Sequence, residues 1–244
     1  LCRKFIIVMT ETLSNLRLVA FDADDTLWDC QGHFDAVEEA YCQILSPYGE
    51  ASAISKSLYD EETSNMPILG FGSKAFTISL VENAIKVSKG TVSNQTLGDI
   101  IKLGKSLLQL PATPLPGVSE TLAELRNNRN YDMVVFTKGD NLDQENKFHK
   151  SGLDKYFDDI IVVSDKNETA YERLCQRFGI GINELCMVGN SYKSDIKPVL
   201  DLGGNAVHIP YSISWEYEHI DEEPDEENDR LSIINNFSEL TDIL

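Results

Sequence analysis

The chain has 244 residues, of which 42% are hydrophobic and 25% are charged. These proportions are typical of globular proteins and exclude collagenous, fibrous and wholly disordered chains. The formal net charge of -19 at pH 7 argues against a nucleic-acid backbone or an anionic membrane surface as a partner.

The first residues and the cysteines indicate the setting in which the protein works. The apolar patch at residues 5–9 is too short to span a membrane, and no small-residue cleavage site follows it. The five cysteines are odd in number and form no Cys-x-x-Cys pair, which favours a reducing compartment over a disulfide framework. We therefore expect a cytoplasmic protein without a membrane partner.

The first predicted element is a strand at residues 16–21, a short apolar run that stops at Asp22. Residues 30–110 instead carry apolar side chains at helical spacing and few signs of strands. We expect them to form a helical cap domain, inserted directly after the first strand so that it covers the carboxyl end of that strand. The proline-rich residues 111–117 end this insert.

Short apolar runs alternate with helical periodicity over residues 116–210. This alternation predicts an α/β domain with a doubly wound parallel, Rossmann-like sheet, whose ligand site lies at the carboxyl ends of its strands. Residues 1–29 and 111–244 would form this core domain. The predicted strands are 133–136, 160–163, 185–188 and 206–209, and the predicted helices are 118–126, 141–150, 169–178 and 194–202.

Acidic residues concentrate after the last predicted strand. Nine of the fourteen residues from 216 to 229 are acidic and none is basic. The run at residues 221–229 repels itself, so we expect a solvated surface loop there. A role in metal binding or partner docking is the alternative.

Two carboxylates follow the first predicted strand. Asp22 and Asp24 are two residues apart, so on an extended backbone their side chains project to the same side and can share one small site. Two crowded anions require a cation, and oxygen ligands favour Mg²⁺. Such an ion would also neutralise an incoming phosphate.

The sequence Asp-Ala-Asp-Asp-Thr at residues 22–26 resembles the first motif of the haloacid dehalogenase superfamily of phosphohydrolases. Thr137 matches the hydroxyl residue of the second motif, and Lys166 matches the lysine of the third. Residues 189–195 match the glycine- and aspartate-containing turn of the fourth motif. The motifs occur in order at four successive strand ends, and the resemblance covers residues 16–210.

The resemblance implies catalytic roles for residues at these strand ends. Asp22 would attack phosphorus and form an aspartyl-phosphate, and Asp24 would act first as general acid and then as general base. Thr137 and Lys166 would complete the catalytic set by holding the phosphoryl oxygens. Backbone amides of the turn after the second strand would also bind the substrate, at Lys138 and Gly139.

The resemblance also implies a metal site whose Mg²⁺ ligands are Asp22, Asp24 through its backbone carbonyl, Asp195 and Asn190. Asn190 departs from the motif, which usually has an aspartate at this position. An amide oxygen can coordinate Mg²⁺ but contributes no negative charge. We therefore expect a lowered affinity for the ion.

As a whole, the resemblance implies a hydrolase of the helical-cap subfamily I, a Mg²⁺-dependent phosphomonoesterase that acts on a small phosphorylated metabolite. The alternatives are a phosphomutase, a dehalogenase of the same fold, or a non-catalytic phosphoacceptor or binding protein. Asp24 argues against the dehalogenase, which does not need a second acid. Trp28 lies just beyond the first motif, where it either packs as core or narrows the substrate pocket.

Overall fold

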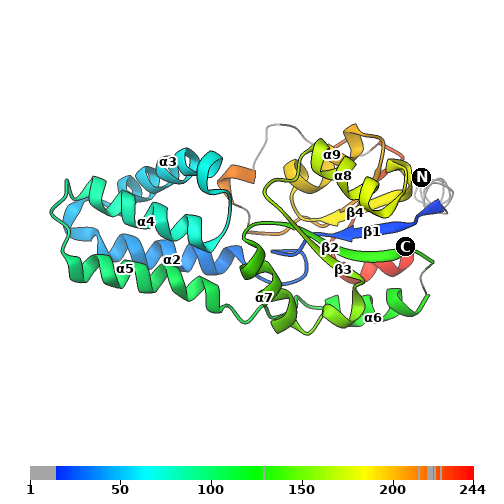
Figure 1. The fold of residues 1–244 in the computed structure, drawn as a ribbon, viewed down its shortest axis with the longest axis horizontal. Coiled ribbons are helices and arrows are strands. Elements are labelled where there is room, and N and C mark those ends of the chain that lie inside the picture. The colour runs from blue at the N-terminus through cyan, green and yellow to red at the C-terminus, as the bar shows by residue number, and fades with distance from the viewer. Residues whose placement is uncertain (1–14, 129, 214, 219–221, 223, 226) are drawn as a thin grey trace. The chain divides into compact units, whose positions relative to one another are not determined.

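The computed structural model describes residues 15–128, 130–213, 215–218, 222, 224–225 and 227–244. These residues form two compact units (Figure 1). The first unit contains the described residues up to Asp29, together with Ala112–Lys138 and Phe148–Leu244, and the second contains Cys30–Pro111 and Gly139–Lys147. The chain therefore enters the second unit twice.

The first unit is built on a six-stranded sheet in which all neighbouring strands are parallel. The strand order is β3-β2-β1-β4-β5-β6, so β1 lies between β2 and β4. The strands are β1 (Leu18–Phe21), β2 (Asp132–Lys138), β3 (Asp159–Val163), β4 (Leu185–Gly189), β5 (Asn205–His208) and β6 (Leu231–Ile233).

Helices cover both faces of this sheet. Successive residues of a strand point to opposite faces, so each strand packs against the helices of both layers. Phe21 of β1 packs in the cluster that includes α6 (Val118–Asn128), whereas Ala20 packs in the cluster of α8 (Glu168–Phe178) and α9 (Lys197–Asp201). All four residues of β1 have 0% exposure. The predicted fold class, a doubly wound parallel sheet with an inserted helical domain, is confirmed.

The helix predicted at residues 194–202 forms in two parts, a π-helical turn at Tyr192–Ile196 followed by α9. Pro198 explains the break. It has no backbone N–H and cannot donate a hydrogen bond to the carbonyl of Ser194. That carbonyl accepts a hydrogen bond from the hydroxyl of Tyr171 instead, at 2.9 Å.

Strand β6 is the element that the sequence pattern does not predict. It is three residues long and has Ser232 at its centre, so it lacks the apolar run that marks the other strands. It pairs with β5 in a register that places Leu231 beside Ala206. Short 3₁₀ turns occur at Ser46–Tyr48, Leu107–Gln109, Asp154–Tyr156, Ile182–Glu184, Glu216–Glu218 and Phe237–Asp242.

The second unit is helical and has its own apolar core, which includes Leu58, Leu80 and Ile100. Two buried polar groups inside it are paired with each other: Asn83 donates to the hydroxyl of Tyr41 at 2.9 Å. The unit's function as a cap stays a prediction. Its helices are α2 (Gln31–Ile44), α3 (Ala51–Leu69), α4 (Ser73–Val87), α5 (Asn94–Ser106) and the first part of α7 (Asn141–Ser151).

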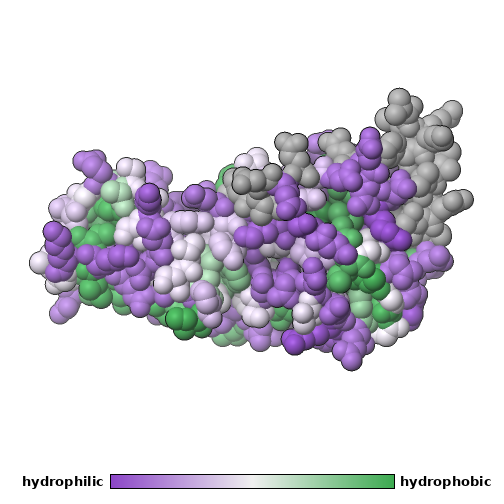
Figure 2. Space-filling model, turned by 90° about the horizontal axis from the view of Figure 1, so that it is seen from above, coloured by the Kyte–Doolittle hydropathy of each residue, from purple (hydrophilic) through white to green (hydrophobic). Residues whose placement is uncertain are grey.

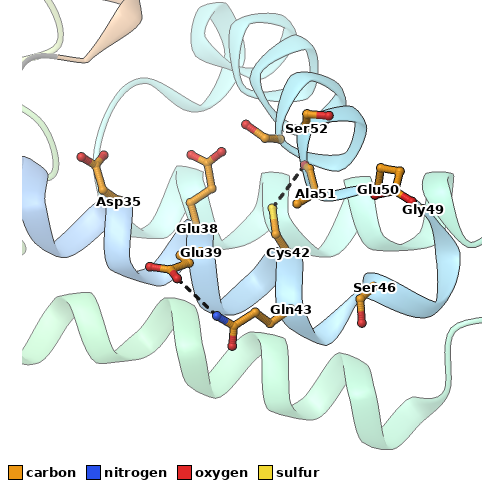
Figure 3. A pocket seen from close by; sticks show the side chains of 11 residues that line it. Asp35, Glu38, Glu39, Cys42, Gln43, Ser46, Gly49, Glu50, Ala51 and Ser52 are labelled. Atoms are coloured by element: carbon orange, nitrogen blue, oxygen red, sulfur yellow. Dashed lines mark hydrogen bonds between the residues drawn. The ribbon is translucent and has the colours of Figure 1, made fainter.

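A pocket of about 880 Å³ opens in the second unit between α2 and the start of α3 (Figure 3). Cys42, a free thiol, contacts the carbonyl of Ala51 there at 3.7 Å. Within the described residues, no three or more His, Cys, Asp or Glu side chains are grouped so that they could hold a metal ion. The pocket is acidic and lined by the carboxylates of Asp35, Glu38, Glu39 and Glu50.

Hydrophilic side chains predominate on the face shown in Figure 2, and apolar side chains form only small patches there. Among the helices that the structure describes, none combines the length and hydropathy needed to cross a membrane.

Two predictions concern residues outside the described ranges. These are the apolar patch at 5–9 and the part of the acidic run at residues 221, 223 and 226.

Two glycines of α5 provide a test of the packing in the second unit. A Cβ at Gly104 would lie 2.3 Å from Oγ1 of Thr77 in α4, whereas a Cβ at Gly98 would meet nothing within 4 Å. We expect Gly104→Ala to lower the free energy of unfolding by about 1–3 kcal/mol through overpacking. Gly98→Ala should raise it by up to about 1 kcal/mol, because alanine favours the helix. Urea unfolding followed by far-UV circular dichroism measures both, and equal effects would contradict the close approach of α4 and α5.

Candidate active site

Charged and polar side chains gather at the carboxyl ends of β1, β3 and β4. Asp22 directly follows β1, and its backbone N–H donates to the carbonyl of Val188 in β4 at 2.8 Å. Lys166 follows β3, and Asp195 lies in the π-helical turn after β4. Because β1, β3 and β4 run parallel in one sheet, their carboxyl ends lie at the same edge, and three residues far apart in the sequence meet there.

Lys166 joins the two carboxylates. Its Nζ donates to Oδ1 of Asp22 and to Oδ1 of Asp195, the latter at 2.6 Å. The side chains of Lys166 and Asp195 are each 1% exposed, so water does not screen the interaction. A buried arrangement of this kind is stable only while the lysine and the carboxylates remain together.

The charges of this group are not balanced. Burial raises the pKa of Asp22 to about 7, and the neighbouring Asp195 raises it as well, while Lys166 acts in the opposite direction. Burial alone would lower the pKa of Lys166, but Asp195 and Asp22 raise it above its usual value. The lysine therefore stays charged, and one ammonium group faces two buried carboxylates. A further cation would be stabilised at this position.

Thr26 links Asp22 to Asn190. Its Oγ1 lies 3.2 Å from Oδ2 of Asp22 and 3.1 Å from Oδ1 of Asn190. A hydroxyl carries one hydrogen, so Thr26 donates to one of these oxygens at a time. The amide oxygen of Asn190 and the carboxylate of Asp22 thus lie within hydrogen-bond distance of the same hydroxyl. Asp22, Asp195 and Asn190 each offer a side-chain oxygen atom to a metal ion at this edge, and metal binding by the backbone carbonyl of Asp24 stays a prediction.

Asp195 is held in place from several sides. The backbone N–H of Ser191 donates to its Oδ2 at 3.0 Å, and the hydroxyl of Tyr171 contacts its carbonyl oxygen at 3.2 Å. A Cβ at position 189 would lie only 2.3 Å from Oδ2 of Asp195. Gly189 is therefore required by the close approach of this carboxylate to the end of β4.

Asp24 and Trp28 form a separate contact in the turn after β1. The indole Nε1 of Trp28 donates to Oδ1 of Asp24 at 2.7 Å. Trp28 is fully buried and belongs to the apolar core of the first unit. Its indole ring is therefore held in place, and the hydrogen bond holds the carboxylate of Asp24 in turn. Asp25 has a φ of 62°, a left-handed conformation that lets the chain turn back. The predicted contact of Trp28 with substrate stays a prediction.

The predicted phosphate-binding residues lie at the end of β2. Thr137 is 1% exposed, and its Oγ1 lies 3.5 Å from the carbonyl oxygen of Lys138, too far for a strong hydrogen bond. Lys138 Nζ donates to Oγ of Ser194 at 3.0 Å and to the carboxylate of Glu218. Gly139 belongs to the second unit and has a φ of 141°. Substrate binding by these residues stays a prediction.

Three residues that shape this edge have no role assigned from the motifs, namely Thr26, Tyr171 and Glu218. Thr26 carries a signal in the sequence, because it is the last residue of the first motif. Tyr171 and Glu218 carry none, since their partners are Ser194 and Lys138, far away in the sequence. Such contacts become visible only when the chain is folded.

Residues 16–203 match the hydrolase family described as haloacid dehalogenase-like hydrolase. The chain belongs to this family. The resemblance carried by the four motifs is thereby confirmed, and this haloacid dehalogenase-like protein is a hydrolase.

Three known proteins show how far the similarity extends. A haloacid dehalogenase-like hydrolase from Xanthomonas campestris is 33% identical, with a TM-score of 0.81, over 92% of this chain and 88% of its own. The glyceraldehyde 3-phosphate phosphatase of Methanothermobacter thermautotrophicus is 24% identical over 94% of this chain and 100% of its own. The 2-haloacid dehalogenase of Pseudomonas syringae pv. Tomato DC3000 is 19% identical, with a TM-score of 0.61, over 93% of this chain and 97% of its own. At that identity the likeness shows the fold alone.

The buried charges of this hydrolase can be tested by removing the lysine. We expect Lys166→Met to lower the free energy of unfolding by about 3–5 kcal/mol at pH 8, because two buried carboxylates lose their cation. The folded-state pKa of Asp22, already about 7 and above its usual 3.8, would rise further. The loss should therefore be largest above that pKa and should shrink as the pH falls toward 5.

Urea unfolding of the wild type and the variant at pH 8 and pH 5, without metal ions, measures this difference. The double variant Lys166→Met/Asp195→Asn is the control, and it should recover part of the stability because it removes one of the two charges. A Lys166→Met variant as stable as the wild type at pH 8 would contradict the arrangement.

Proposed function

We propose that this hydrolase is a Mg²⁺-dependent phosphomonoesterase that forms an aspartyl-phosphate on Asp22 and acts on a small phosphorylated metabolite. The observation that carries the proposal is the meeting of Asp22, Lys166 and Asp195 at the carboxyl edge of the sheet. The arrangement combines a nucleophile, a cation and an unneutralised negative charge. Phosphoryl transfer requires positive charge beside the nucleophile, because the anionic phosphate otherwise repels it. Lys166 supplies one such charge, and the excess negative charge would hold a further cation.

The oxygen donors at this edge fit Mg²⁺. The ion binds proteins through one or two carboxylates and keeps other positions for water and substrate oxygens. Asp22 and Asp195 supply the two carboxylates, and Asn190 supplies an amide oxygen beside Asp22. The raised pKa of Asp22 indicates an environment that favours an added cation. When bound there, Mg²⁺ would neutralise negative charge on the phosphoryl group.

The residues of the chain would then divide the reaction into two steps. In the first step, a carboxylate oxygen of Asp22 attacks phosphorus and the bond from phosphorus to the ester oxygen breaks. Asp24 gives its proton to the departing oxygen. In the second step, Asp24 takes a proton from water, which attacks the aspartyl-phosphate and releases inorganic phosphate. The hydrogen bond from Trp28 would orient the Asp24 carboxyl group for both transfers.

Lys166 and Thr137 would hold the phosphoryl oxygens, as would the backbone amides of Lys138 and Gly139. Lys166 is suited to this task because it is charged and fixed by two partners. A group held in place before the reaction loses little entropy when the transition state forms. The helical second unit would act as the cap that selects the substrate.

The proposed substrate class is supported by a relative, the glyceraldehyde 3-phosphate phosphatase that matches 94% of this chain. We therefore propose a phosphate monoester of a small metabolite, with glyceraldehyde 3-phosphate as the first compound to test. Proteins that are 24% identical can act on phosphate esters with different leaving groups, so other phosphorylated metabolites belong in the same test.

A first experiment tests the nucleophile. We expect the wild type to hydrolyse p-nitrophenyl phosphate and glyceraldehyde 3-phosphate with Mg²⁺ and not after its removal by EDTA. Asp22→Asn should lower kcat/KM about a thousandfold or more, because the amide is a far poorer nucleophile. Asp25→Asn is the matched control. It lies in the same turn and has a φ of 62°, which asparagine adopts readily, so its activity should remain.

Full activity in Asp22→Asn would remove the mechanism. Release of chloride from 2-chloropropionate by the wild type, without phosphatase activity, would show a dehalogenase instead. Inactivity toward every phosphate ester and haloacid would indicate a non-catalytic protein.

A second experiment tests Asp24. Because p-nitrophenolate leaves without protonation, the first step should survive in Asp24→Asn, whereas the second step lacks its base. We expect a rapid burst of about one p-nitrophenolate per active site, followed by turnover slowed about a hundredfold or more. Stopped-flow absorbance measures the burst. Slow release without a burst would show that Asp24 is not the base of the second step.

A further inference from the structure

Glu218 is a partly buried carboxylate in the acidic stretch that follows β5, and its side chain is 14% exposed. It accepts hydrogen bonds from Lys138 Nζ, from Oγ of Ser194 at 2.6 Å and from Oγ of Ser191. Three donors thus converge on one carboxylate. This is how a protein compensates the cost of burying a charge.

The donors come from both sides of the strand that carries the nucleophile. Lys138 is the last residue of β2, whereas Ser191 and Ser194 follow β4. In the sheet, β2 and β4 are the two neighbours of β1, at whose end Asp22 lies. Glu218 therefore ties together the two turns that flank Asp22.

A second contact fixes the segment that carries Glu218. The carbonyl oxygen of Tyr217 accepts a hydrogen bond from Lys193 Nζ at 2.6 Å, and the same Nζ lies 3.7 Å from the centre of the Tyr217 ring. Lys193 belongs to the same π-helical turn as Asp195. Two consecutive residues of the acidic stretch are thus bound to the turn after β4, in contact with different partners.

The turns joined by Glu218 carry the groups that the proposed reaction needs. The turn after β4 contains Asn190 and Asp195, and the end of β2 carries the backbone amides of Lys138 and its neighbour. No sheet hydrogen bond joins β2 to β4, because β1 lies between them, so contacts made by Lys138 Nζ and Glu218 connect these two segments. A displacement of about 1 Å at such a site can reduce the rate about a hundredfold.

We propose that Glu218 is a positioning residue of this hydrolase, which sets the spacing of the β2 and β4 turns by binding Lys138, Ser191 and Ser194. The inference rests on the proposed phosphatase function. Glu218 does not itself touch the reacting atoms in this role. It acts through the residues it binds, so its loss should change the rate of the chemical step more than the binding of substrate.

Glu218→Gln tests the role, because it keeps the size of the side chain and removes the charge that holds Lys138. With Mg²⁺ and p-nitrophenyl phosphate, we expect kcat to fall at least tenfold, KM to change less than twofold, and the Mg²⁺ concentration for half-maximal activity to rise. Glu216→Gln is the matched control. Glu216 lies in the same 3₁₀ turn but is exposed, so this variant should behave like the wild type.

A double-mutant cycle with Lys138→Met separates positioning from general stability. If Glu218 acts through Lys138, the loss in kcat of the double variant should be clearly smaller than the product of the two single losses. Thermal unfolding of each variant identifies the temperature range in which all are folded. Unchanged kcat and Mg²⁺ dependence in folded Glu218→Gln would overturn the proposal, as would a raised KM with kcat unchanged.

Failure of the proposed function gives a different result. In that case the wild type itself hydrolyses no phosphate ester, and the kinetic comparison is replaced by amide hydrogen exchange. Peptides spanning residues 138–139 and 190–195 should exchange faster in Glu218→Gln than in the wild type, and at the wild-type rate in Glu216→Gln. Unchanged exchange at both turns would show that Glu218 does not hold them.

Discussion

The active edge of this protein depends on one buried ammonium group placed between two buried carboxylates. Lys166 contacts both Asp22 and Asp195, and all three come from different strand ends. Burial of either carboxylate alone would be unfavourable, so each strand end is held in place by the charge of the others. The parallel sheet supplies the geometry, because its strands end at the same edge and apolar layers cover both of its faces.

Much of this organisation could be predicted from the sequence, because strands buried on both faces give continuous apolar runs and their polar ends interrupt those runs sharply. Asp22 and Lys166 were identifiable on that basis and through their motifs. The break in the predicted helix after β4 was not. The break depends on Pro198, which leaves the carbonyl of Ser194 without a helical hydrogen bond, and on Tyr171 of α8, whose hydroxyl donates to that carbonyl. Helical periodicity records which residues are apolar and contains no information about such a partner.

Glu218 illustrates a second limit of sequence patterns. Charge patterning averages over a segment, and the segment from 216 to 229 is acidic enough to indicate solvent exposure. Glu216 follows this rule and is exposed, whereas Glu218, two residues later, is partly buried against Lys138. Burial raises the pKa of Glu218, but Lys138 and the hydroxyls of the β4 turn lower it below its usual value, so the carboxylate stays ionised in the fold. The individual partner, and not the local charge density, decides where this side chain lies.

Asn190 can be understood from the same balance of charge. An aspartate at this position would place a third carboxylate beside Asp22, around the single hydrogen of the Thr26 hydroxyl. The added negative charge would raise the pKa of Asp22, already about 7, still further. An amide keeps an oxygen next to Asp22 without this repulsion. We therefore expect Asn190 to stabilise the metal-free fold and, by the same reasoning, to give up part of the electrostatic attraction for a divalent ion.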